Sequence, residues 1–255
     1  MDLATFTGRL DDELSTTAYA DLDASVNGLQ VGRDEADVQR VAVAVDAAAA
    51  TIETAVDRDA DVLVVHHGLS WGGIDRITGR TRDRIARLLE ADVALYVSHL
   101  PLDGHQSLGN AAGVADLLGL ENRAPFGDVG PEVVGQLGTV PGGTDADTVA
   151  ATLDDGLDHG GEGVQVLDFG PERLERVAVV TGSGADWFDE AVEADADAFV
   201  TGEGKGKLYH QARESDLTVF LGGHYATETF GVRSLADLIA EWGLETTWID
   251  APTGL

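Results

Sequence analysis

The sequence of 255 residues contains no cysteine. Disulfide bonds, thiolate metal sites and cysteine nucleophiles are therefore excluded. Any metal ion must be held by nitrogen and oxygen ligands, which suit zinc, iron, manganese, nickel or magnesium. No stretch approaches the ~20 consecutive apolar residues that a membrane-spanning helix needs, and the first residues lack the pattern of a secretory signal. We expect a soluble, cytoplasmic protein.

Basic residues are scarce as well: 16 lysines and arginines face 46 aspartates and glutamates, for a net charge of −30. The acidic residues are spread through every segment and not gathered in a tail. This distribution favours a whole surface adapted to high salt, a halophilic surface, where repulsion between like charges is screened. The chain also lacks the basic stripe that displaces counterions from phosphates, so we do not expect nucleic acid as a partner.

The chain does contain a regular alternation of apolar runs and helical patterns. Its apolar fraction of 44% is enough for a sizeable core. The alternation predicts an α/β fold, with mostly parallel sheets covered on both faces. In the first half, strands are predicted at 41–45, 62–65 and 93–97, and helices near 81–90 and 108–118.

The same pattern begins again at Arg176. The stretch from Arg40 to Gly68 matches the later one at a constant offset of 136, and the next strand matches at an offset of 125. This alignment pairs His67 with Glu203, His99 with His224, and Asp103 with Glu228. Any two βαβ units share some likeness, but the coincidence of two His-x-x-x-acid patterns favours a true duplication. We therefore predict two similar lobes related by a pseudo-twofold.

Residues 121–172 interrupt the rhythm with prolines and glycines. They contain strand patterns near 133–137 and 164–167 and a helical pattern near 147–157. We predict a bridging or inserted subdomain here. The predicted division is a first α/β lobe at 1–120, the bridging subdomain at 121–172, and a second lobe at 173–255 that packs with the first around a shared metal site.

Imidazoles and carboxylates gather where the predicted strands end, which is the edge where ligands bind to open parallel sheets. These residues are His66, His67, His99, Asp103, Glu203, His224 and Glu228. A lone histidine at a strand end is usually a hydrogen-bonded core residue. Here most of the seven histidines occupy such positions, which favours a metal centre. Because the candidates exceed the needs of one tetrahedral ion, and a carboxylate such as Glu228 can bridge two ions about 3.5–4 Å apart, we expect two ions.

These motifs resemble the Nif-three-like dinuclear metal-centre proteins, often labelled GTP cyclohydrolase I type 2. The matching segments keep the family's order over nearly the whole chain. They are residues 27–31, 65–68, 99–103, 108–110, 181–184, 201–203 and 223–228. One departure is Tyr225, where relatives often have a second histidine.

The resemblance implies a ligand set for two divalent ions (zinc, iron, manganese or nickel). These ligands are His66, His67, Asp103, His224 and Glu228. His99 and Glu203 would lie at the edge of the site. The resemblance also implies a homo-oligomer, a toroidal hexamer built as a trimer of dimers, with the metal sites facing an internal cavity.

The leading hypothesis is a metal-dependent hydrolase that acts on a nucleotide or another phosphoester, with His99 or Glu203 transferring protons. The family label implies opening of the imidazole ring of GTP. The alternative is a metal-binding scaffold or metallochaperone without turnover. The sharpest expectation is an asymmetry between the two His-x-x-x-acid patterns. His224 and Glu228 would both bind metal, whereas in the first pattern only Asp103 would, which leaves His99 for proton transfer.

Overall fold

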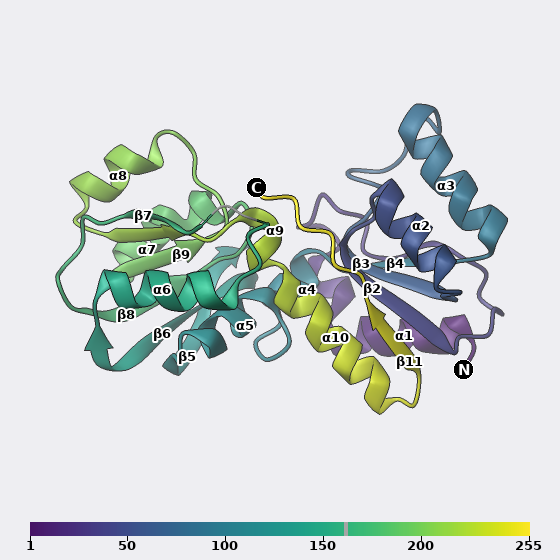
Figure 1. The fold of residues 1–255 in the computed structure, drawn as a ribbon, viewed down its shortest axis with the longest axis horizontal. Coiled ribbons are helices and arrows are strands. Elements are labelled where there is room, and N and C mark those ends of the chain that lie inside the picture. The colour runs from purple at the N-terminus through teal and green to yellow at the C-terminus, as the bar shows by residue number, and fades with distance from the viewer. Residues whose placement is uncertain (161–162) are drawn as a thin grey trace. The chain divides into compact units, whose positions relative to one another are not determined.

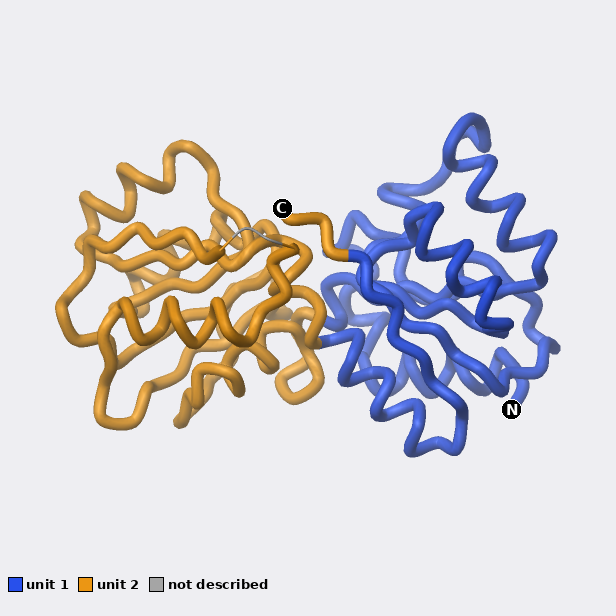
Figure 2. The backbone as a smooth tube through the Cα atoms, viewed as in Figure 1, with its two compact units in different colours: residues 1–102, 231–251 blue, residues 103–230, 252–255 orange. Residues whose placement is uncertain are grey.

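The structure, a computed structural model, describes residues 1–160 and 163–255. Residues 161 and 162 fall in the segment predicted to bridge the lobes and lie outside the described residues. The chain forms two compact units (Figure 2). Unit 1 comprises residues 1–102 and 231–251, and unit 2 comprises residues 103–230 and 252–255. Each unit is a sheet with helices on both faces, which confirms the predicted α/β class.

Unit 1 is built on a five-stranded sheet in the order β1-β4-β3-β2-β11. Its strands are β1 (Gly28–Val31), β2 (Arg40–Asp46), β3 (Val62–His67), β4 (Ala94–Val97) and β11 (Glu245–Trp248). Its helices are α1 (Leu3–Glu13), the short 3₁₀ helix η1 (Thr16–Tyr19), α2 (Ala49–Asp57), α3 (Gly79–Ala91) and most of α10 (Thr229–Glu241). All neighbouring strands are parallel except β1, which runs antiparallel to β4.

The central strands of unit 1 are apolar on both sides because helices cover both faces. Figure 1 shows α2 and α3 on one side of the sheet and α1 and α10 on the other. On the first side, Ile52 of α2 and Leu88 of α3 are buried against Leu63 of β3 and its neighbours. On the other side, the Tyr96 hydroxyl of β4 donates to Asp11 of α1 at 2.8 Å.

Helix α10 and strand β11 return to unit 1 after the chain has built unit 2. Strand β11 pairs in parallel with β2, with Thr246 opposite Val41 and Trp248 opposite Val43. Helix α10 buries Val232, Leu235 and Ile239. A strand from the end of the sequence thus completes the edge of the first sheet.

Unit 2 is built on a six-stranded sheet in the order β5-β6-β8-β9-β10-β7. Its strands are β5 (Glu121–Val129), β6 (Glu132–Thr144), β7 (Gln165–Leu167), β8 (Leu174–Val179), β9 (Ala198–Thr201) and β10 (Thr218–Leu221). Its helices are α5 (Asn110–Leu117), α6 (Ala146–Gly156), the 3₁₀ helix η2 (Gly184–Trp187), α7 (Phe188–Glu193), α8 (Leu208–Glu214) and α9 (His224–Thr227). Helix α4 (Leu100–Gly104) contains the crossing from unit 1.

Only the middle of the second sheet is parallel. Strands β8, β9 and β10 run parallel, whereas β5, β6 and β7 join antiparallel. These three antiparallel strands come from residues 121–172, so the sheet is more mixed than the predicted mostly parallel one. The reason is local: β5 and β6 are joined by a tight turn in which Gly130 has φ 63°, and a turn of this length joins only antiparallel strands.

The duplication predicted from the sequence extends to backbone details within each unit. The Asp61 carboxylate accepts from the amides of residues 39 and 40 at 2.9 and 2.8 Å, and Asp197 accepts from those of residues 175 and 176 at 2.8 and 2.9 Å. Asp59 and Asp195 have left-handed φ values of 52° and 51°. These pairs all keep the offset of 136.

The third strand of each repeat follows a different offset. Val65 is paired with Val97, and Thr201 with Leu221. This register sets an offset of 124 within the strand, one less than the 125 predicted from the histidines. The second copy therefore has one more residue between the strand and its histidine.

No helix among the described residues is long and apolar enough to cross a membrane.

Candidate metal centre

Three histidines lie together in unit 1, at the ends of β3 and β4. Their side-chain nitrogens lie within 4.8 Å of one another, which is close enough for one metal ion. The ring centres of His66 and His67 are 4.6 Å apart, and His99 lies 5.0 Å from the first and 5.6 Å from the second. The sequence predicted all three at this edge, and the structure brings them together.

Each of these imidazoles is oriented through its Nδ1 atom. In His66 this atom lies 2.9 Å from the Ser98 carbonyl oxygen, and in His67 it lies 3.0 Å from an Asp46 carboxylate oxygen. An oxygen acceptor on Nδ1 places the proton there and leaves the Nε2 lone pair for a metal. This is the usual arrangement around metal-binding histidines. The tautomers follow from these partners.

His99 is held in the same manner by Asp23. Its Nδ1 lies 2.9 Å from one carboxylate oxygen of Asp23, whose other oxygen accepts from the Leu100 amide at 2.9 Å. Burial is the largest influence on the Asp23 carboxyl and raises its pKa, but the hydrogen bond and charge of His99 help to outweigh it, so the pKa is lowered overall. No sequence pattern pointed to this carboxylate, which lies in a loop without periodicity.

Gly68, which follows the histidine pair, packs closely against neighbouring side chains. A Cβ atom here would lie 2.6 Å from both the Gln30 amide and a Val97 methyl. Close packing beside β4 therefore requires glycine at this position.

The remaining predicted ligands lie in unit 2. Asp103 is buried and accepts from the Asn110 side chain at 2.8 Å and from the Thr181 hydroxyl at 3.4 Å. Carboxylate oxygens of Asp103 and Glu228 lie within 4.8 Å of each other. Helix α9 brings His224 to Glu228 by i,i+4 spacing, with Nε2 3.3 Å from the carboxylate. Unit 2 thus gathers two buried carboxylates and one imidazole.

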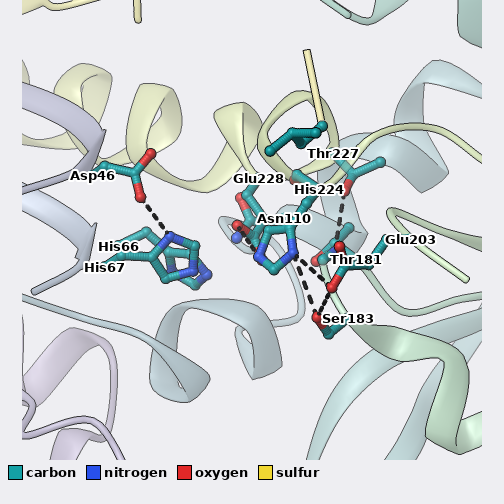
Figure 3. A network of polar contacts seen from close by, with 12 residues as sticks. Asp46, His66, His67, Asn110, Thr181, Ser183, Glu203, His224, Thr227 and Glu228 are labelled. Atoms are coloured by element: carbon teal, nitrogen blue, oxygen red, sulfur yellow. Dashed lines mark hydrogen bonds and ion pairs between the residues drawn. The ribbon is translucent and has the colours of Figure 1, made fainter. Parts of the chain in front are cut away.

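Glu203 and Ser183 complete a small polar network around His224 (Figure 3). Glu203 lies 3.3 Å from the Nδ1 atom of His224, and the Ser183 hydroxyl donates to Glu203. Burial, the largest influence, lowers the pKa of His224, but the carboxylates of Glu228 and Glu203 together raise it to about 9. The pKa of Glu203 is lowered, mainly by the hydrogen bond from Ser183.

Gly182 lets the backbone approach this network closely. It has φ +57°, and a Cβ atom on it would lie 2.0 Å from Glu228 Oε1 and 3.3 Å from His224 Nε2. Its amide donates to the Thr227 hydroxyl at 3.1 Å. The structure gives the glycine a specific task, which is to leave room for the His224–Glu228 pair.

The donors in both units suit divalent cations that prefer nitrogen and oxygen. Unit 1 presents oriented imidazoles, and unit 2 presents an imidazole between carboxylates in a space that a single Cβ atom would fill. Sequence reasoning missed the supporting residues Asp23, Asp46 and Ser183. Asp46 ends an apolar strand, as the histidines do, so the same signal was available for it.

Comparison with known proteins gives a consistent result. The model of the family Duf34/NIF3 (NGG1p interacting factor 3) matches residues 1–253. A protein of Halobacterium salinarum named GTP cyclohydrolase 1 type 2 homolog is 57% identical over 255 residues, which is 100% of both chains. The protein of the same name from Archaeoglobus fulgidus is 40% identical over 256 residues, again 100% of both.

Solved structures agree over the full length. TTHA1606 from Thermus thermophilus has a TM-score of 0.90 at 37% identity, and the protein ybgI, titled as of unknown function, has 0.88 at 35%; each comparison covers 100% of both chains. Reduced HcgD from Methanocaldococcus jannaschii shares the fold, with a TM-score of 0.82 at 24% identity over 98% of each chain. Sequence and fold thus lead to one assignment: the chain belongs to the DUF34/NIF3 family.

Proposed function

We propose that this protein holds two divalent metal ions and acts as a metal-dependent hydrolase on a nucleotide or another phosphoester. The observation that carries the proposal is the distribution of ligands. Unit 1 gathers imidazoles at the ends of β3 and β4, and unit 2 gathers two carboxylates and one imidazole, from α4 and from the segment after β10. The proposed ligands are His66, His67, Asp103, His224 and Glu228, and the ions are zinc, iron, manganese or nickel.

The protein's own residues would orient the substrate and move protons. Two divalent cations supply Lewis acidity and a water that is nucleophilic at neutral pH. His99, held at Nδ1 by Asp23, has Nε2 as the atom that takes up or releases a proton. Glu203, with a lowered pKa, is a carboxylate at neutral pH and can accept a proton. The exclusion of His99 from the metal ligands stays a prediction.

The names of the relatives favour a nucleotide substrate, because both are called GTP cyclohydrolase 1 type 2 homolog. GTP is therefore the first substrate to test, followed by generic phosphoesters. We also propose a toroidal hexamer, a trimer of dimers. Sedimentation velocity of the purified protein tests this assembly separately from activity.

The test combines metal analysis with a hydrolase screen of the parent protein and two variants. Glu228→Gln removes a buried carboxylate, so metal content and hydrolysis should both fall, with activity reduced at least about 100-fold. His99→Gln should keep the metal and lose activity. Glu214→Gln, an exposed change in α8 of unit 2, is the matched control and should change neither.

Three results would contradict parts of this proposal. Activity unchanged after metal loss in Glu228→Gln rules out metal-dependent hydrolysis. Loss of metal in His99→Gln makes His99 a ligand and refutes its separate role. Stoichiometric, exchangeable metal without turnover on any screened substrate identifies a scaffold or metallochaperone.

A further inference from the structure

Helices α2 and α3 of unit 1, which lie side by side (Figure 1), enclose a pocket of about 360 Å³. All the residues that line it come from these two helices. The volume lies within the range of about 300–1,000 Å³ that is typical of small-molecule sites. None of the proposed metal ligands lines this pocket.

Three arginines line the pocket: Arg80, Arg84 and Arg87. They belong to a segment, residues 76–87, that contains five of the 16 basic residues of the chain. In a protein with a net charge of −30, this local concentration of positive charge is exceptional. It therefore requires an explanation that the acidic surface as a whole does not provide.

Both carboxylates of the pocket already have partners. Glu53 binds the Arg87 guanidinium through two contacts, of 2.7 and 3.1 Å. Asp83 binds Arg82, which does not line the pocket, at 2.9 Å. Among the described residues, Arg80 and Arg84 form no ion pair. The pocket therefore keeps two uncompensated guanidinium groups beside a third that Glu53 holds in place.

When no anion is bound, the positions of Arg80 and Arg84 are electrostatically unfavourable. Four residues apart, they lie on the same face of α3, where like charges repel. Arg80 also lies in the first turn, where a cation opposes the helix dipole. Between the helices, the exposed Ala49 provides apolar surface, whereas Ile52 is buried. Both charge penalties disappear when an anion binds between the guanidinium groups.

We propose that this pocket binds a small phosphate monoester of the nucleoside monophosphate class. The phosphate lies between Arg80 and Arg84, because guanidinium groups bind phosphate oxygens in pairs. The organic part lies along Ala49, and its planar base stacks on a guanidinium face. This site does not depend on the proposed hydrolase activity or on the metal centre.

Isothermal titration of the metal-loaded protein, in a salt concentration at which it is folded, tests the proposal. Guanosine monophosphate, adenosine monophosphate and inorganic phosphate are the probes. We expect one nucleotide per chain, and weaker binding of inorganic phosphate. The double variant Arg80→Gln/Arg84→Gln should weaken nucleotide binding at least about tenfold, because two charge-assisted contacts are lost.

Two controls give the result its meaning. Arg76→Gln removes one positive charge from the same segment, outside the pocket, and should leave the affinity within about twofold of the parent, because long-range attraction is screened. Glu214→Gln, an exposed change in α8 of unit 2, should bind the nucleotide as the parent does, which shows that the loss belongs to the pocket arginines. Circular dichroism should show the same helix content in every variant.

Three outcomes would overturn the proposal. The first is absence of nucleotide binding at millimolar concentration, and the second is an equal loss of affinity in Arg76→Gln. The third is an altered sedimentation coefficient of the double variant with unchanged nucleotide affinity. The loop before α3 exposes Ile74 by 44% and Ile77 by 55%, so this last result would identify the segment as an interface between copies.

Discussion

The two units share a scaffold but differ in the chemistry at their strand ends. In both units, a turn between parallel strands contains an aspartate with left-handed φ, at residue 59 or 195. Each unit also has an aspartate, at residue 61 or 197, whose carboxylate accepts hydrogen bonds from two backbone amides, an arrangement that we call a carboxylate clasp. At the end of the second strand, unit 1 has His66 and His67, whereas unit 2 has Gly202 and Glu203. After the duplication, both copies kept these aspartates, whereas the side chains at the strand ends that can bind a metal ion changed.

The units also differ at the edges of their sheets. Unit 1 is completed by β1 and β11, and unit 2 by three antiparallel strands from residues 121–172. The equivalent strands lie in the middle of each sheet, where burial on both faces restricts change. Strands added at an edge alter less packing, because an edge has only one neighbour. Divergence is therefore greatest at the strand ends and at the sheet edges.

Removal of salt should have the largest effect on the stability of the two units. Acidic residues are spread through both units, so repulsion should act on both when the Debye length grows from about 3 Å at 1 M to about 10 Å at 0.1 M. We expect both units to unfold or loosen in dilute buffer. Fluorescence of Trp187 reports on unit 2, and that of Trp242 on unit 1, in single-tryptophan variants. Full thermal stability in dilute buffer refutes a halophilic surface.

Gly182→Ala should produce the next largest effect. The new Cβ atom would lie 2.0 Å from Glu228, on backbone with φ +57°. The His224–Glu228 pair must move, and metal affinity should fall more than about 100-fold. In unit 1 the equivalent position, offset by 136, is Asp46, where a side chain is accommodated. Gly206→Ala is the control, since nothing lies within 4 Å of its Cβ position. Metal affinity measured against a competing chelator would contradict this explanation if both variants resembled the parent.

The titration of unit 2 gives a third test. With a pKa of about 9, His224 is protonated at neutral pH in the metal-free protein, so metal uptake must release this proton. Apparent metal affinity should therefore rise about tenfold per pH unit between 7 and 9. Because the folded pKa is raised above 6.5, the stability that His224 adds to the metal-free protein is present below pH 6.5 and lost as the pH rises through 9.

Unit 1 should show the opposite dependence. The pKa of Asp23 is lowered in the folded protein, so the stability it contributes is present above its unfolded value and is lost as the pH falls through the lowered one. Urea denaturation of the metal-free protein, compared with His224→Gln and with Asp23→Asn, separates the two effects. A parent and a His224→Gln variant with the same pH profile above 6.5 would contradict the assignment for unit 2.

Substitution of the residues that orient the candidate metal-binding side chains should reduce metal affinity by different amounts in the two units. Asp46 orients His67 in unit 1, and Ser183 orients Glu203 in unit 2. Asp46→Ala should lower metal affinity about 10–100-fold, the usual cost of losing such support. Ser183→Ala should cost less than about tenfold, because the Glu203 side chain is 51% exposed while that of His67 is 17% exposed. Equal losses would show that the two supports are equivalent.

The sequence predicted much of the fold because the equivalent strands carry strong local signals. The apolar run at 41–45 became β2 (Arg40–Asp46), and the helical pattern near 147–157 became α6 (Ala146–Gly156). Histidines and carboxylates after such runs pointed to the strand ends. The constant offset of 136 also held in hydrogen bonds that no sequence pattern describes.

Other features depend on partners far away in the chain and leave no local trace. The pairing of β11 with β2 joins residues about 200 positions apart, and no periodicity in either strand indicates it. The second copy has one additional residue between its third strand and His224, so the strands match at an offset of 124 while the histidines match at 125. Alignment on the histidines alone does not reveal this difference. The task of Gly182 follows from the position of Glu228, 46 residues later, and only the folded backbone shows it.

The smallest effect on stability should come from substitution of the carboxylate clasps, which are the most similar feature of the two units. Asp61→Ala and Asp197→Ala each remove a carboxylate that accepts from two backbone amides. Each should destabilise its own unit by about 1–2 kcal/mol, because the acceptors are charged but open to solvent. Hydrogen exchange resolves the units separately, and faster exchange should be confined to the unit that carries the substitution. Equal effects would mean that the clasp kept its energetic role after duplication. A much larger effect in unit 1 would mean that unit 2 now relies on its added antiparallel strands for the same stability.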